Sequence, residues 1–278
     1  MLATAYAAVL VGVALFQSRL VFFPDIGRAL AATPRDAGLA YEEVRLATTD
    51  GESLHAWFVP APQSRGTVLL FHGNAGNISH RLDYLPVIFR LGYSTFIFDY
   101  RGYGRSSGRP SEQGTYRDAE AAWRYLTDTR KIEPQRIALL GESLGGAVAA
   151  WLASRQPAGA LVLASVFTSV PDMGAEVYPF LPVRLLSRID YNTLEHLKKV
   201  RAPVLVAHSR DDDIVPYRHG RALFDAAREP KTFLEMSGGH NESFLFSRES
   251  WVREFGEFLD RYVGDPAVVG LVLPPGNR

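Results

Sequence analysis

The chain has 278 residues, of which 47% are hydrophobic, enough to bury one large core and to favour a single α/β domain. Basic and acidic residues number 30 each and no local run of Lys or Arg occurs, so the pattern excludes the electrostatic footprint of a nucleic-acid-binding protein. The absence of cysteine excludes disulfides, a thiol nucleophile and thiolate metal sites.

The N-terminal segment is strongly apolar. Leu2 to Phe16 carries no charge, and an extension to Phe23, with Arg19 reaching the polar interface along its stem, gives the length of a membrane-spanning helix. No side-chain base precedes the segment and no small-x-small cleavage site follows it. Residues 1–23 are therefore predicted to be an uncleaved membrane anchor, in preference to a signal peptide or a helix packed on the domain. The arginines that follow favour a cytoplasmic location for the rest of the chain.

From residue 40 onward, short apolar runs alternate with helical patterns, which is typical of a mostly parallel sheet covered on both faces. The expected strands are Glu43–Thr48, Leu54–Val59, Thr67–Phe71, Ser94–Phe98, Arg136–Leu140, Ala160–Leu163, Val204–Ala207 and Thr232–Leu234. The first two flank a Thr-Asp-Gly turn and predict an antiparallel hairpin. The expected helices are Ile78–Leu91, Gly114–Thr127, Ser143–Ser154, His219–Ala227 and Ser250–Tyr262.

One connection between two predicted strands is long and rich in proline. Ser169–Val200 contains three prolines among aromatic and apolar residues and is predicted to form a small lid of short helices. The tail after residue 264 contains Pro-Pro-Gly and no periodic pattern. The predicted organisation is an anchor over residues 1–23, a domain over residues 24–264 with its lid at about 169–200, and a loose tail over residues 265–278.

The stretch Gly141–Gly146 lies between a predicted strand and a predicted helix. A Gly-x-Ser-x-Gly pattern in that setting predicts a nucleophile elbow, a tight turn that exposes one serine hydroxyl. Its glycines leave room where a Cβ would collide with the neighbouring chain. Ser143 is therefore the predicted nucleophile, and the alternative is a glycine-rich turn with a capping serine.

A serine hydroxyl needs a base to take its proton, and His240 is the predicted base. It follows two glycines after the last predicted strand, at the sheet edge where open α/β sheets bind ligands. A carboxylate must orient the imidazole. Asp211, Asp212 and Asp213 all follow a strand and remain candidates, in the chain order serine, acid, histidine; a solvated acidic turn is the alternative. Of the other histidines, four are interpreted as surface or capping residues (His55, His80, His196, His219) and His72 as a brace of its loop.

An acyl-transfer site also needs backbone N–H groups near the attacked carbonyl. Leu144, the residue after the serine, is predicted to supply one such group. The second is expected from the glycine-rich loop His72–Asn77, which follows a predicted strand, and Asn74 is the predicted donor.

Five stretches together resemble the α/β-hydrolase superfamily: Phe71–Asn77, Asp99–Gly104, Gly141–Gly146, His208–Pro216 and Gly239-His240. More narrowly, they resemble its membrane-anchored serine-hydrolase branch, which includes eukaryotic protein depalmitoylases. The resemblance implies an α/β-hydrolase fold with a mostly parallel, eight-stranded sheet. It also implies a His-Gly-x-x-Asp-x-x-Val-Pro pattern, which selects Asp212 and leaves Asp211 as the other contender, with Ser209 in place of the glycine. It implies, finally, that Ser143, Asp212 and His240 converge.

The predicted function is a serine hydrolase that cleaves ester or thioester bonds through an acyl-enzyme on Ser143. No metal or organic cofactor is implied. The apolar segment and lid favour a substrate with an acyl chain, such as a lipid or a lipid-modified protein. The alternatives are a serine peptidase or an acyltransferase with the same triad, or a catalytically silent scaffold on the same fold.

Overall fold

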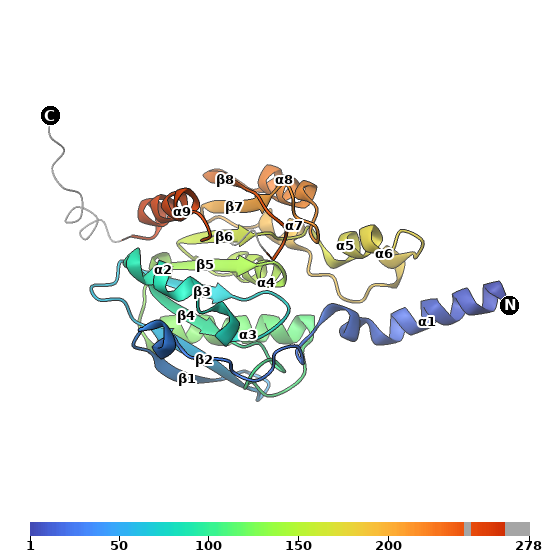
Figure 1. The fold of residues 1–278 in the computed structure, drawn as a ribbon, viewed down its shortest axis with the longest axis horizontal. Coiled ribbons are helices and arrows are strands. Elements are labelled where there is room, and N and C mark those ends of the chain that lie inside the picture. Colours follow the sequence, from blue (N-terminus) through green and yellow to red (C-terminus); the bar gives the residue numbers. More distant parts are fainter. Residues whose placement is uncertain (242–245, 265–278) are drawn as a thin grey trace.

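The sheet is the centre of the molecule. In the computed structural model, which describes residues 1–241 and 246–264, eight strands form one sheet in the order β1-β2-β4-β3-β5-β6-β7-β8. Helices cover both faces of this sheet, and α1 extends away from it (Figure 1). This is the α/β-hydrolase architecture that the sequence predicts.

The first two strands, β1 (Glu42–Ala47) and β2 (Ser53–Val59), form the predicted antiparallel hairpin. β2 also pairs antiparallel with β4, and all later pairings are parallel. The bounds of the later strands are β3 Thr67–Phe71, β4 Ser94–Phe98, β5 Ile137–Glu142, β6 Ala160–Ala164, β7 Val204–Ser209 and β8 Lys231–Met236. Every residue of β3, β4 and β6 is buried, which explains why these strands are unbroken apolar runs in the sequence.

Side chains alternate between two hydrophobic clusters, one on each face of the sheet. Leu69 of β3 packs with α3 (Glu112–Arg124), α4 (Leu144–Ala153) and α8 (Tyr217–Ala226). Its neighbour Leu70 packs with α2 and α9 on the other face. Helix α2 spans Tyr84–Arg90 and helix α9 spans Glu249–Tyr262. The period of two along each strand therefore supplies both layers of the core.

The single helix predicted over Ile78–Leu91 is wrong. A 3-10 turn over Ile78–Arg81 is followed by the separate helix α2. Pro86 is the reason, because it has no N–H to donate to the carbonyl four residues earlier and its ring would clash with that carbonyl. In the first turn of α2 no such bond is required. The predicted helix over Gly114–Thr127 also differs at its end, where α3 passes into a π-helical turn, Tyr125–Thr129.

The apolar N-terminal segment is helical over α1 (Leu2–Val21), with a kink at Phe16, where φ is −110° and ψ is 18°. Its window Thr4–Val21 has a mean hydropathy of 1.5 and none of it is buried in the structure. This length and composition are those of a membrane-crossing helix, and a signal sequence would have them too. The next residue, Phe22, is buried in the core, and a 3-10 turn, Pro34–Ala37, leads on to β1.

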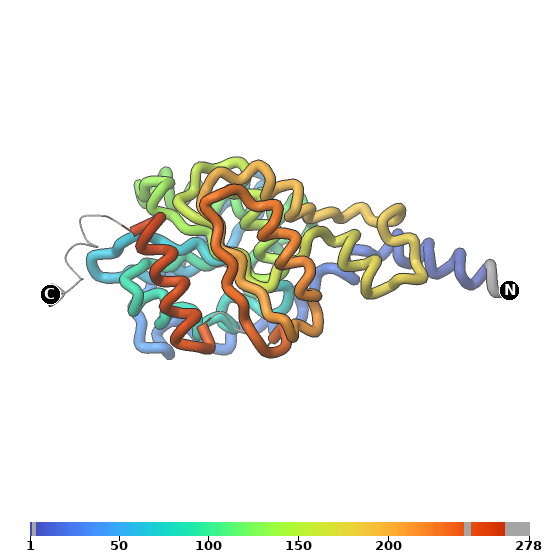
Figure 2. Tube along the Cα trace, turned by 90° about the horizontal axis from the view of Figure 1, so that it is seen from above, coloured from blue at the N-terminus to red at the C-terminus, as the bar shows by residue number. Residues whose placement is uncertain are grey.

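The predicted lid region is a helical insertion between β6 and β7. It contains α5 (Val170–Val177), α6 (Val183–Leu186) and α7 (Thr193–Leu197). Ser169 caps α5 and Asn192 caps α7 through their side-chain oxygens. Figures 1 and 2 both show α5 and α6 beside α1, away from the body of the sheet. The predicted tail, residues 265–278, lies outside the described residues.

Candidate active site

Ser143 lies in a sharp turn between β5 and α4. Its φ of +51° and ψ of −118° form a conformation that a residue with a Cβ adopts at a cost in strain. The surrounding backbone holds it there: the Ser143 N–H donates to the Ala164 carbonyl at 2.9 Å, and the Gly146 N–H donates to the Ser143 carbonyl at 3.0 Å. This geometry is that of the nucleophile elbow that the sequence predicts.

Two glycines allow this turn to form against the rest of the sheet. A Cβ on Gly141 would collide with the backbone of Gly146, and a Cβ on Gly145 would collide with the carbonyl oxygens of Phe71 and His72. The first turn of α4 therefore packs directly on the end of β3. This close approach sets Ser143 near the loop that follows β3.

Asp212 and His240 form a hydrogen-bonded pair in which the carboxylate is buried. His240 Nδ1 lies 3.0 and 2.9 Å from the two carboxylate oxygens of Asp212. The same carboxylate accepts hydrogen bonds from the backbone N–H groups of Ile214 at 3.0 Å and Val215 at 2.7 Å. Burial raises the pKa of Asp212, but these bonds outweigh it and hold the pKa below its ordinary value of 3.8. Asp212 is therefore ionised and fixes the proton of His240 on Nδ1.

The two neighbouring aspartates contact other groups of the same loop. Asp213 accepts a hydrogen bond from the His240 N–H at 2.8 Å, and Asp211 accepts one from the Gly238 N–H at 3.4 Å. Ser209, which stands where the family pattern has glycine, donates its hydroxyl to the Gly238 carbonyl at 2.6 Å. Of the three neighbouring aspartates, the one that contacts the imidazole is Asp212, which the family pattern selects.

A second histidine lies beside the carboxylate. His208 Nε2 is 3.6 Å from an oxygen of Asp212 and 2.8 Å from the Val215 carbonyl. Burial lowers the pKa of His208, so its ring is neutral and donates the Nε2 proton to that carbonyl. His208 therefore supports the loop after β7 without adding charge to it.

Strand order brings the predicted site residues to one edge of the sheet. Ser143 follows β5, Asp212 follows β7 and His240 follows β8, and these strands are parallel. Only β6 separates β5 from β7, so the strand ends that lead to Ser143 and Asp212 lie about 10 Å apart. Within the part of the chain that the structure describes, hydrogen bonds join His240 to Asp212 but none joins Ser143 to His240. Such contacts commonly tighten only when substrate binds.

The predicted oxyanion donors lie on both sides of the elbow, Asn74 after β3 and Leu144 at the start of α4. Within residues 1–241 and 246–264 neither backbone N–H has a hydrogen-bond acceptor. The Asn74 side chain has a role that the sequence analysis missed. It accepts hydrogen bonds from the Tyr103 hydroxyl at 2.8 Å and the Phe23 N–H at 3.2 Å, and donates to the Val21 carbonyl at 2.5 Å. It thus ties the end of α1 to this loop.

Known proteins share both the sequence pattern and the fold. Residues 66–185 match the family model described as alpha/beta hydrolase fold. Over 282 residues the chain is 38% identical to the alpha/beta hydrolase domain-containing protein WAV2 of Arabidopsis thaliana, and the match covers 91% of this chain and 92% of the relative. The chain belongs to the α/β-hydrolase fold family.

Two further comparisons support this assignment. This α/β-hydrolase-fold chain is 32% identical over 218 residues to the human alpha/beta hydrolase domain-containing protein 17B, covering 77% of this chain and 71% of the relative. Among solved structures, the esterase Pf2001 of Pyrococcus furiosus matches with a TM-score of 0.73 and 22% identity, over 84% of this chain and 96% of that chain. At this identity the structural match shows the shared fold.

The residue before the nucleophile supports the hydrolase-fold elbow in a way that the sequence did not reveal. Glu142 accepts hydrogen bonds from Arg81 Nε at 3.2 Å and from the Tyr84 hydroxyl at 2.9 Å. Burial raises the pKa of Tyr84 well above its ordinary value, so the phenol keeps its proton and donates it. Arg81 also donates to the Ala75 carbonyl at 3.4 Å. This cluster therefore joins the elbow to the loop that carries Asn74.

Two histidines that were interpreted as surface or capping residues are buried, so that interpretation is wrong. His55 lies in β2 with Nδ1 3.4 Å from Asp99, and His219 Nδ1 lies 2.9 Å from the Thr168 hydroxyl. Their partners come from other elements, which a local sequence pattern cannot reveal. His72 is buried as well: burial lowers its pKa to about 4, and the neutral ring donates from Nδ1 to its neighbour's carbonyl at 2.7 Å. This agrees with the predicted loop brace.

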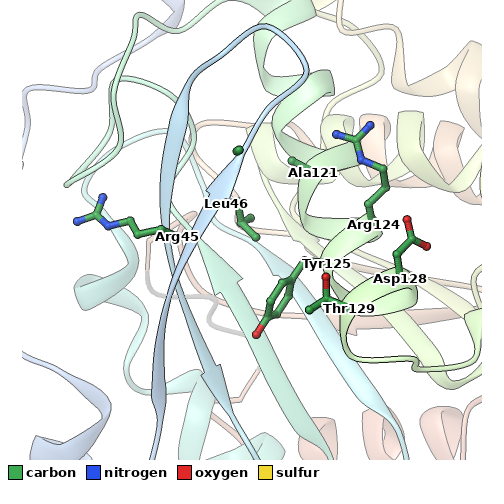
Figure 3. Close-up of a pocket in the computed structure, with 8 residues that line it drawn as sticks. Arg45, Leu46, Ala121, Arg124, Tyr125, Asp128 and Thr129 are labelled. Carbon is green, nitrogen blue, oxygen red and sulfur yellow. The ribbon is translucent and has the colours of Figure 1, made fainter.

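A hollow of about 280 Å³ lies elsewhere on the hydrolase fold, between β1 and the end of α3. Figure 3 shows its lining, in which Arg45 and Leu46 come from β1 and Tyr125 from the π-helical turn. None of its lining residues belongs to the loops that carry Ser143, Asp212 and His240, so it is separate from the candidate site. Within residues 1–241 and 246–264, no cluster of three His, Asp or Glu side chains has the arrangement of a metal site.

Proposed function

We propose that this protein is a serine hydrolase that cleaves the carboxylic ester or thioester bonds of acyl substrates. The observation that carries the proposal is the Asp212–His240 pair, with Nδ1 2.9 Å from the carboxylate, on the sheet edge where Ser143 lies in a strained elbow. A serine held in this way is an activated nucleophile in acyl transfer.

The reaction proceeds in two steps. Ser143 Oγ attacks the carbonyl carbon as His240 Nε2 takes its proton, and the Asn74 and Leu144 N–H groups stabilise the oxyanion. His240 then gives this proton to the leaving alcohol or thiol as the C–O or C–S bond breaks. Water next attacks the acyl-enzyme, its proton passes to His240 Nε2, and the acid leaves with the proton returned to Ser143. Asp212 stabilises the imidazolium in both steps.

We propose a substrate with an acyl chain, such as a lipid or a lipid-modified protein. Two features support this choice: α1 has the length and composition of a membrane anchor, and the insertion between β6 and β7 exposes apolar side chains beside it. An anchored enzyme encounters acyl chains where they are concentrated, at the membrane. The arginines after α1 support a cytoplasmic side for the catalytic domain.

Labelling with a fluorophosphonate probe tests the proposal, because the probe reacts with activated serines. We expect the intact protein to be labelled and the Ser143→Ala and His240→Ala variants not to be. Ser154→Ala, at the other end of α4, and His196→Ala, in the insertion, are matched controls that keep labelling. Folded intact protein without label, or label that survives Ser143→Ala, would contradict the proposal. If the protein is labelled, the next step is to measure its hydrolysis of esters and thioesters of graded acyl-chain length.

A further inference from the structure

The insertion between β6 and β7 exposes large apolar side chains at its tip. Leu185 is 87% exposed and Phe180 is 68% exposed, and Val177 and Tyr178 are also exposed. Arg184 is the charged residue of this tip, and it forms an ion pair with Asp172 of α5 at 3.0 Å. An apolar cluster of this kind on a short segment is costly in water and indicates a surface that another apolar phase covers.

This tip lies along α1. The Tyr6 hydroxyl donates to the Phe180 carbonyl at 2.9 Å, and Gln17 Nε2 donates to the Leu186 carbonyl at 2.6 Å. Gln17 Oε1 also accepts a hydrogen bond from the Arg188 N–H at 2.7 Å. From Tyr6 to Gln17, α1 advances about 16 Å, so the insertion follows much of the helix. Figures 1 and 2 show the two segments side by side.

The exposed apolar surface of the tip continues onto the helix. Val9, Val11, Leu15 and Phe16 of α1 are exposed. The polar side chains of Tyr6 and Gln17, in contrast, are used to bind the backbone of the insertion. This distribution suits lipid, where an apolar surface is covered and each backbone polar group needs an internal partner.

Several backbone groups of the tip have hydrogen-bond partners within the protein. The N–H groups of Leu181, Val183 and Leu185 donate to carbonyls within the same turn, and the Phe180 carbonyl accepts the hydrogen bond from Tyr6. These bonds, which include those of the short helix α6, leave fewer unpaired backbone groups than an open loop would, so the tip can enter the interfacial layer of a bilayer at a lower cost.

Basic residues surround the end of α1 that joins the domain. Arg19, Arg28 and Arg109 line a hollow of about 880 Å³ together with Phe23, Ile26 and Asp25, and the Asp25 carboxylate lies 3.5 Å from Arg28. Arg188, at the domain end of the insertion, is exposed as well. Arginines that flank an apolar segment are attracted to anionic lipid headgroups, so the charge here is complementary to the surface of a bilayer that contains such lipids.

We propose that the tip Val177–Leu186 inserts into an anionic bilayer beside α1, with these arginines at headgroup depth. The proposal depends on the membrane location of α1. The insertion starts from the end of β6, which neighbours the strand that ends at the elbow, so the Ser143 edge of the sheet faces the membrane. An acyl substrate then reaches Ser143 directly from the bilayer surface.

The lack of cysteine allows a direct test with single labels. Leu185→Cys at the tip, Val9→Cys on α1 and Glu257→Cys on α9 are each prepared in the full chain and labelled with the fluorophore NBD. The proteins are reconstituted into vesicles of phosphatidylcholine and phosphatidylglycerol that carry doxyl-labelled lipid. We expect NBD at positions 185 and 9 to be quenched by the doxyl lipid, and NBD at position 257 to be quenched only by aqueous iodide.

The outcome at position 185 decides the proposal. If NBD at position 185 behaves as it does at position 257, the proposal is wrong, whether or not position 9 is in lipid. Fluorophosphonate labelling of the Leu185→Cys protein in detergent reports separately on Ser143. A loss of membrane insertion and a failure of the proposed catalytic function are therefore distinguished in the same variant.

Discussion

Three consecutive aspartates after β7 hold three different groups of the loop that carries His240. Asp212 binds the imidazole, Asp213 binds the backbone N–H of the same residue, and Asp211 binds the N–H of Gly238. Identical side chains thus act differently because each points to a different part of one loop. Their order in the sequence contains no information about these directions.

This difference predicts unequal effects of equal substitutions. In Asp212→Asn the charge that supports the imidazolium is lost and the amide favours the wrong tautomer, so the rate of serine labelling should fall by about 10⁴-fold. Asp211→Asn is the matched control; its 3.4 Å contact is long and keeps an acceptor oxygen, so the rate should change by less than about tenfold. Similar losses in both variants would contradict the assignment of Asp212.

The pKa of Asp212 predicts a dependence of stability on pH. Because the folded state lowers this pKa below its ordinary value of 3.8, the ionised carboxylate is preferred in the folded state. The resulting stabilisation is present above about pH 4 and is lost as the pH falls through the lowered value. Denaturant unfolding of the intact protein and of Asp212→Asn should therefore show a free-energy difference at neutral pH that shrinks at pH 3. A constant difference would show that the carboxylate contributes no ionisation-linked stability.

Close backbone contact between elements builds the elbow. Gly145 lies against the carbonyls that end β3, and Gly146 lies against the side chain of Val166 after β6. The backbone of a buried strand cannot move aside for an added methyl group as readily as a side chain can. The two adjacent glycines therefore differ in how a methyl group would be accommodated.

Alanine at each glycine tests this distinction. Gly145→Ala should lower the free energy of unfolding by about 1–3 kcal/mol and abolish labelling of Ser143, because β3 and α4 must separate. Gly146→Ala should cost a similar amount, but Val166→Ala in the same chain should restore part of the stability by making room. Thermal unfolding and fluorophosphonate labelling measure both effects. Rescue of Gly145→Ala by Val166→Ala would contradict this explanation.

At the scale of the whole molecule, the segment after α1 is part of the folded domain. Phe22 is buried in the core, Phe23 pairs with Ala75, and the Ile26 carbonyl accepts the Gly76 N–H at 3.1 Å. The N-terminal helix is therefore connected to the loop with the predicted oxyanion donor by a segment that is hydrogen-bonded to that loop and anchored in the core by Phe22.

Two truncations test the role of this segment. A chain that begins at Phe22 should remain folded and be labelled by the probe, but should bind vesicles much more weakly than the full chain. A chain that begins at Arg28 also loses the buried Phe22 side chain. Its free energy of unfolding should be about 3 kcal/mol lower than that of the chain that begins at Phe22. Circular dichroism during denaturation and vesicle flotation measure these properties. Equal stability of the two chains would contradict a structural role for residues 22–27.

Sequence patterns predicted both ends of all eight strands to within two residues. Buried parallel strands such as β3 are marked by their own apolar residues and by the turns beside them. The helix over Ile78–Leu91 failed because Pro86 outweighs the apolar pattern around it. The burial of His55 was missed because its partner Asp99 lies in a different element.

The sequence by itself determined the fold class, the elbow and the apolar N-terminal helix, because each depends on the order of neighbouring residues. The run of three aspartates left the partner of His240 open, and the family resemblance selected Asp212. Only the tertiary structure shows the Asp212–His240 contact itself and the position of the insertion tip along α1. These contacts join residues distant in the chain, and their geometry depends on how the strands stack in the sheet and where the loops fold back. The conformational preferences of neighbouring residues do not specify these long-range contacts, so tertiary packing decides which residues meet.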